Sequence, residues 1–143
     1  SALRNGEDRP HRLYGTKDCG IEVVNGERIS YKHLGCGISH VHITFDSDLN
    51  RVTLPGDNCE RYHSMRCNTY LDSPLMCMPK TLCREFILTL KKNGKEETVL
   101  KVENNRKRSY DIEIDGTPEE ITLTPISNWG GSDRTRVFSF DFR

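Results

Sequence analysis

Two histidines stand two positions apart in residues 40–45, which read HVHITF. Residues i and i+2 of a strand point to the same face, so the imidazoles of His40 and His42 would lie side by side. Such a pair can bind a metal ion with a third ligand such as His33 or His63, or place a general base beside a substrate. The plainer interpretation is the polar outward face of a strand whose alternate residues are apolar. Because the sequence places no third ligand, we favour that interpretation and expect neither a metal ion nor another cofactor.

A second cluster occupies residues 59–63, which read CERYH and include Glu60, Arg61 and His63. Small secreted ribonucleases use a Glu/His pair with an arginine, for proton transfer and for phosphate charge. A secreted hydrolase using His40, His42, Glu60 or His63 is therefore the alternative function, and a killer-type toxin is another. The charges adjoin cysteines in an expected surface loop, so we favour a protein that is not an enzyme and assign no catalytic residue.

The six cysteines all lie in the first 83 residues: Cys19, Cys36, Cys59, Cys67, Cys77 and Cys83. No pair has the two-residue gap of zinc ribbons and fingers. An even number of cysteines in a small polar chain is typical of disulfides formed in an oxidising compartment. The sequence predicts three disulfides and a secreted, extracellular protein, and it leaves the pairing open.

The single tryptophan, Trp129, stands in residues 127–132, SNWGGS, between two expected strands. A tryptophan in a loop can anchor a partner, because it offers a large contact area at low entropic cost. It can equally cap the open end of a β unit, and the sequence does not decide between the two. Arg134 follows closely and is a second candidate contact.

The basic run Arg106, Lys107 and Arg108 could meet an anionic partner. Residues 91–108 hold seven bases and three acids, whereas residues 111–120 hold five acids and no base. If these segments form adjacent strands of a meander, cross-strand ion pairs are the expected use of the charges. We favour ion pairing and keep the basic run as a candidate binding site.

The chain has 143 residues, with 21 basic and 21 acidic side chains. This length supports one domain or two small ones. The zero net charge argues against a nucleic-acid binder. No apolar run reaches the length of a membrane span.

Period-2 alternation and turn residues place the strands. Asn25-Gly26 predicts a hairpin over residues 20–31, Asn93-Gly94 predicts one over 85–102, and Asp115-Gly116 predicts a third turn before 121–126. The chain ends in residues 136–142, where Phe138, Phe140 and Phe142 alternate and are expected on one face. Residues 55–83 have no clean period and predict an irregular segment.

These signals predict an all-β fold of antiparallel hairpins or a small β-sandwich, with a disulfide-stapled N-terminal half that contains the irregular segment. Residues 1–18 are expected to be a flexible arm. Residues 19–83 would form the stapled β unit and residues 84–143 a cysteine-free antiparallel β unit. Whether the two units share one core is left open.

A six-cysteine first half joined to a cysteine-free β half resembles the layout of dual-domain effectors secreted by plant-pathogenic fungi. The resemblance covers residues 19–143 and rests on cysteine placement and strand number. It implies a virulence protein without enzymatic activity that a host immune receptor recognises. We therefore predict a secreted binding protein with a protein partner, a host protein or immune receptor, contacted through Trp129, Arg134 and residues 106–108.

Overall fold

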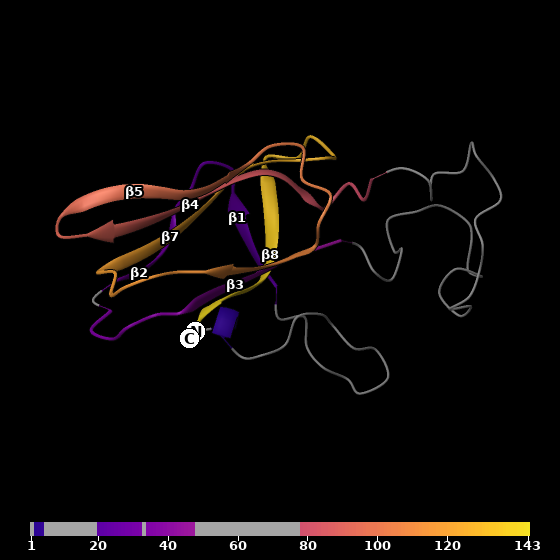
Figure 1. The fold of residues 1–143 in the computed structure, drawn as a ribbon. Helices are drawn as coiled ribbons and strands as arrows, with labels where there is room; N and C mark the ends of the chain where they lie inside the picture. Colours follow the sequence, from indigo (N-terminus) through magenta and orange to yellow (C-terminus); the bar gives the residue numbers. More distant parts are fainter. Residues whose placement is uncertain (1, 5–19, 33, 48–77) are drawn as a thin grey trace, which may run out of the picture.

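Two antiparallel sheets of four strands each face one another in this computed structural model, which describes residues 2–4, 20–32, 34–47 and 78–143 (Figure 1). The elements are η1 (Ala2–Arg4), β1 (Ile21–Val24), β2 (Ile29–Lys32), β3 (His40–Phe45), β4 (Cys83–Lys92), β5 (Lys95–Val102), β6 (Ser109–Glu113), β7 (Glu120–Asn128) and β8 (Arg134–Phe142). The predicted all-β sandwich is confirmed. Among the residues described, no helix is long and apolar enough to cross a membrane.

Each sheet contains strands from both halves of the chain. The first sheet has the order β1-β8-β3-β6 and the second has the order β2-β7-β4-β5. Strands β1, β2 and β3, from before residue 83, therefore pair with β8, β7 and β6 from after it. The two halves of the chain therefore share one core, which the sequence left open, because both contribute strands to the same sheets.

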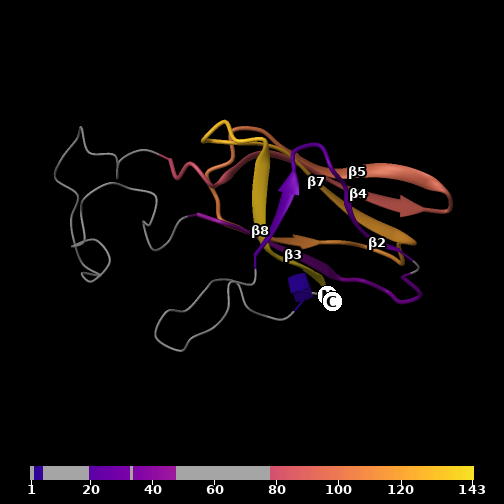
Figure 2. The same ribbon diagram turned by 180° about the vertical axis from the view of Figure 1, so that it is seen from behind.

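One hydrophobic core fills the space between the two sheets. Its fully buried aromatic side chains are Phe45, Phe86 and Phe140, from β3, β4 and β8. The Phe45 and Phe86 rings have centroids 5.0 Å apart, so the two halves of the chain meet in direct aromatic contact. Leu3 of η1 is also buried in this core, and η1 packs against β8 beside the C-terminus (Figure 2).

Strand β8 does not carry its phenylalanines on one face, and that prediction is wrong. The pairing of β3 with β8 shifts between Thr44 and Phe45, so that Phe45 lies opposite Val137. This bulge lets Val137 and Phe140 both enter the core. Phe138, next to Val137, is buried outside the core cluster, where the Arg136 guanidinium lies 5.5 Å from its ring centroid.

The turns at Asn25-Gly26 and Asp115-Gly116 connect strands of different sheets, since β1 and β6 belong to the first sheet and β2 and β7 to the second. Only Asn93-Gly94 closes a local hairpin, between β4 and β5. Of the two arrangements that the sequence allowed, consecutive hairpins and a small sandwich, the structure has the sandwich, and the hairpin predicted over residues 20–31 does not form.

The same crossing separates strand β5 of the basic segment from strand β6 of the acidic segment. Strand β5 forms an edge of the second sheet, whereas the acidic β6 forms an edge of the first. Asp111 of β6 pairs with Arg143, at 3.5 Å, and Lys101 of β5 pairs with Glu103, at 2.9 Å. Strands β5 and β6 are therefore not neighbours. The two charged segments pair in register where Lys91 of β4 lies opposite Glu120 of β7, and no ion pair joins them among the described residues.

Candidate binding surface at the loop end

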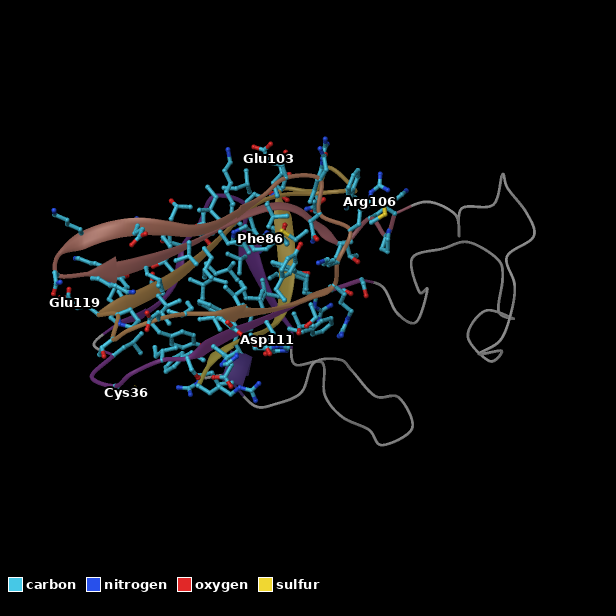
Figure 3. All side chains as sticks on the ribbon, in the orientation of Figure 1. Cys36, Phe86, Glu103, Arg106, Asp111 and Glu119 are labelled. Carbon is cyan, nitrogen blue, oxygen red and sulfur yellow. The ribbon has the colours of Figure 1, made fainter. Side chains whose placement is uncertain are left out.

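Connections between strands gather at one end of the sandwich, which we call the loop end. Its described segments are 25–28, 46–47, 78–82, 103–108 and 129–133. The opposite end, which we call the far end, holds 34–39, 93–94 and 114–119. Figure 3 shows Arg106 at the loop end and Glu119 at the far end.

A polar hollow of about 400 Å³ opens at the loop end. We call it the loop-end hollow, and it is lined by Glu22, Asp46, Lys80, Thr81, Asn128, Gly130, Ser132, Arg134 and Arg136. The lining combines three cations, two carboxylates, two hydroxyls and an amide. It contains no aromatic or aliphatic residue among its described lining, so hydrogen bonds and ion pairs would orient a ligand there.

Asn128 shapes one wall of the loop-end hollow. This buried amide ends β7, and its Nδ2 donates to the carbonyl oxygens of Ser132, at 2.9 Å, and Arg134, at 2.8 Å. Its Oδ1 accepts a bond of 3.0 Å from the Ser132 backbone N–H. Satisfying these backbone groups fixes the loop 129–133, and hence the position from which Arg134 extends.

Gly130 lets a second segment close the hollow. Its backbone N–H donates to the Lys80 carbonyl, at 2.8 Å, and the Trp129 N–H donates to the Leu82 carbonyl, at 3.1 Å. A Cβ built at Gly130 would lie 2.8 Å from the Lys80 carbonyl oxygen. Only a glycine permits this approach, which brings Lys80 to the hollow.

Arg136 and Glu22 are cross-strand partners on the outer face of the first sheet. Arg136 is half-buried, and this burial lowers the pKa of its guanidinium. An arginine remains protonated despite such a shift, because its ordinary pKa is far above neutrality. The described lining of the loop-end hollow therefore has three basic and two acidic side chains.

Trp129 is half-buried and connects the loop end to the core. Its Nε1 donates to the Asn105 carbonyl, at 2.7 Å, and its ring packs against the core. The Arg84 guanidinium lies 5.0 Å from the ring centroid, within cation–π range. Trp129 thus supports the end of the sandwich, which is one of the two roles that the sequence left open, and its role as a contact for a partner stays a prediction.

The basic run is held by Asn105, which is 2% exposed. The Asn105 Nδ2 donates to the carbonyls of Cys83 and Lys107, each at 2.8 Å. Its Oδ1 accepts from the Lys107 N–H, at 2.7 Å, and from the Tyr110 hydroxyl, at 2.6 Å. Arg106 and Lys107 consequently extend outward from a fixed backbone, and both are exposed. Arg108 is half-buried, and its carbonyl accepts from the Phe45 N–H.

The alternative catalytic residues do not form a described site. His40 and His42 lie on β3 and are half-buried, while Glu60 and His63 lie outside the described residues. The residues opposite His42 are Asp111 and Asp141, and its Nε2 lies 3.1 Å from the Thr44 hydroxyl. Within the described part of the chain, no three histidine, cysteine or acidic side chains are grouped to hold a metal ion.

Cys36 and Cys83 are free thiols, which corrects the prediction that all six cysteines pair. Cys83 is fully buried and donates to the Glu85 carbonyl, at 3.2 Å. Burial raises the pKa of this thiol to about 12, so it is protonated and unreactive at neutral pH. The other four, Cys19, Cys59, Cys67 and Cys77, lie outside the described residues.

The structure brings together residues that the sequence suggested separately and adds others. Trp129, Arg134 and residues 106–108 all lie at the loop end. The loop end also contains residues that the sequence did not indicate, namely Lys80, Arg84, Asn105 and Asn128. Only the Gly130-Gly131 pair signals the close approach in sequence, and no local pattern marks Asn105.

Comparison with protein-family models gives no match, and comparison with curated protein sequences gives none either. Among solved structures, the chain is similar to the family 32 carbohydrate-binding module from Streptococcus pneumoniae EndoD, with 10% identity and a TM-score of 0.45 over 87% of this chain and 68% of that chain. It is also similar to the family 32 module from C. perfringens NanJ in complex with galactose, with 16% identity and a TM-score of 0.40 over 86% and 64%. These values do not assign the chain to a family.

Proposed function

We propose that this protein is a non-enzymatic binding domain that holds a small acidic sugar in the loop-end hollow. The observation that supports this most is the convergence of Lys80, Arg134 and Arg136 on one polar hollow of about 400 Å³. Small-molecule sites in proteins commonly have volumes of this order. An excess of cations favours a ligand that carries a carboxylate or a sulfate.

The remaining lining groups favour a sugar over a simple anion. The carboxylates of Glu22 and Asp46 accept hydrogen bonds from hydroxyls, and the hydroxyls of Thr81 and Ser132 both donate and accept. A free inorganic anion has only acceptors, so it would be repelled by the two carboxylates. A uronic or sulfated sugar supplies hydroxyl donors together with the negative charge.

Titration with glucuronic acid and with glucose tests this proposal. We expect glucuronic acid to bind more tightly, because only it carries a charge for the cations. Arg134→Gln should weaken glucuronic acid binding roughly tenfold, through loss of a charge-assisted hydrogen bond. Isothermal calorimetry or NMR titration measures both affinities.

Lys95→Gln is the matched control, because Lys95 is an exposed cation beside the far-end turn. It should leave both affinities unchanged. Equal binding of the two sugars, or equal loss in both variants, would contradict the proposed site.

A second candidate function is contact with a host protein by a secreted effector. The stacking of Arg84 on the half-buried Trp129 favours it, since Trp and Arg are enriched at the centres of protein interfaces. Secretion would be supported by pairing among Cys19, Cys59, Cys67 and Cys77. Thiol counting in denaturant should then detect two free thiols, and six would argue against an oxidising compartment.

A further inference from the structure

Four cations lie along the loop end from the hollow outward: Lys80, Arg84, Arg106 and Lys107. We call them the basic ridge. All four side chains are exposed. Lys80 belongs both to the hollow and to the ridge, and so joins the two.

Backbone contacts make the basic ridge continuous. The Gly130 N–H binds the Lys80 carbonyl, and the neighbouring Trp129 carries Arg84 on its ring. The Asn105 N–H then donates to the Arg84 carbonyl, at 2.8 Å. The Asn105 side chain binds both the N–H and the carbonyl of Lys107. The backbone segments that carry the four cations are therefore hydrogen-bonded to one another in series.

Acidic neighbours do not neutralise the ridge. Within the described residues, no ion pair includes Lys80, Arg84, Arg106 or Lys107. Glu103, the nearest acid in sequence to Arg106, pairs with Lys101 instead. The acidic residues Glu113, Asp115 and Glu119 lie toward the far end. The basic ridge is therefore a group of exposed cations without ion-pair partners in the part of the chain that the structure describes, which an anionic partner can approach.

We propose that the ligand is a sulfated polysaccharide chain, with one acidic sugar in the loop-end hollow and the following sugars over Trp129 and along the basic ridge. This inference rests on the proposed function and extends it from a single sugar to a chain. Repeated sulfates on a stiff chain match cations that a fixed backbone presents in series. The hydroxyl-binding groups of the hollow favour this ligand over an acidic peptide or a nucleic acid.

The test compares a sulfated glycosaminoglycan chain, heparin, with its disaccharide unit and with desulfated heparin. The ridge variant is Arg106→Gln combined with Lys107→Gln, and the control is Lys32→Gln combined with Lys95→Gln, which removes two exposed cations at the far end. We expect the ridge variant to lose roughly fivefold to tenfold in affinity for heparin and nothing for the disaccharide. The control should match the native chain with every probe.

The other outcomes separate a failure of the basic ridge from a failure of the loop-end hollow. If Arg134→Gln weakens disaccharide binding but the ridge variant binds heparin normally, the ridge is not part of the site and the proposed function stands. If desulfated heparin or duplex DNA binds as tightly as heparin, the ligand is not a sulfated chain. If neither heparin nor its disaccharide binds, the inference is wrong, and only the glucuronic acid titration then decides the proposed function.

Discussion

Asn105 is a buried side chain whose hydrogen bonds connect three segments of the loop end. It joins the Cys83 carbonyl on β4, the backbone of Lys107, and the Tyr110 hydroxyl on β6. Its own carbonyl receives the indole N–H of Trp129. The Asn105 side chain therefore positions the basic run, because it satisfies backbone groups that would otherwise lack partners, while its backbone carbonyl positions the tryptophan.

Replacement of Asn105 by alanine should destabilise the protein and expose the basic run to trypsin. Loss of the buried hydrogen bonds should lower the free energy of unfolding by about 2–4 kcal/mol. A protease needs a locally open backbone, so cleavage after Arg106, Lys107 or Arg108 should become at least about tenfold faster. Limited proteolysis with mass spectrometry identifies these bonds.

Leu88→Ala provides the control, since Leu88 is fully buried on β4 and lies away from this loop. It should cost a similar amount of stability, about 2–5 kcal/mol. If it speeds cleavage at residues 106–108 as much as Asn105→Ala does, global unfolding rather than the Asn105 contacts controls access.

Turns with the same sequence signal connect the strands in different ways: one joins paired neighbours, and the others join strands of different sheets. Asn93 and Gly94 have φ values of 50° and 74°, as a tight hairpin turn requires, and they join the paired strands β4 and β5. Gly26 and Gly116 also have positive φ, but their turns connect strands of different sheets. A turn signal thus predicts a change of direction, while the pairing partner depends on which sheet buries each strand.

Pro125 likewise shows that a local sequence signal does not decide where a strand ends. Its place in β7 should interrupt a central strand, because proline lacks the N–H that a ladder needs. Strand β7 nevertheless runs on to Asn128, and the register of β4 shifts opposite, between Glu85 and Phe86. The irregularity accommodates the proline without ending the strand.

Gly130→Ala should disturb the contact between the loop 129–133 and residues 80–82. The added methyl would meet the Lys80 carbonyl oxygen at 2.8 Å, and a backbone atom cannot move aside as a flexible side chain can. We expect a loss of about 1–3 kcal/mol, measured as a lower Tm by thermal denaturation. Gly35→Ala is the control, because nothing lies within 4 Å of its added Cβ. Equal Tm values for the two variants would show that the approach at Gly130 is not required.

The whole molecule is held together by strands that are distant in sequence. Strand β3 lies between β8 and β6 in the first sheet, and its Val41, Ile43 and Phe45 are fully buried. Neither half of the chain can complete that sheet alone. We therefore expect folding to require residues 20–45 and 84–143 together.

A fragment of residues 84–143 should fail to fold. Without β3, strands β6 and β8 lose their shared neighbour, and the core loses its contacts from the first half. We expect no cooperative thermal transition by circular dichroism, compared with a single transition for the full chain. A cooperative transition in the fragment would show instead that residue 84 begins an independent domain.

The sequence by itself determined the class of fold and the positions of most strands. Alternation such as that in residues 40–45 and 109–115 is local, because each side chain's face depends only on its place along the strand. It also identified Trp129, Arg134 and residues 106–108 as candidate contacts. These conclusions needed no knowledge of which strands are neighbours.

Only the tertiary structure decided how these parts meet. It placed strands β5 and β6 at the edges of different sheets, turned Phe138 away from the core, and brought Lys80, Arg84 and Trp129 to one end. Each of these outcomes depends on pairing between residues far apart in the chain, which burial of the whole core selects and no local pattern encodes. The zero net charge is a property of the sequence, whereas the gathering of Lys80, Arg84, Arg106 and Lys107 at the loop end is a property of the fold.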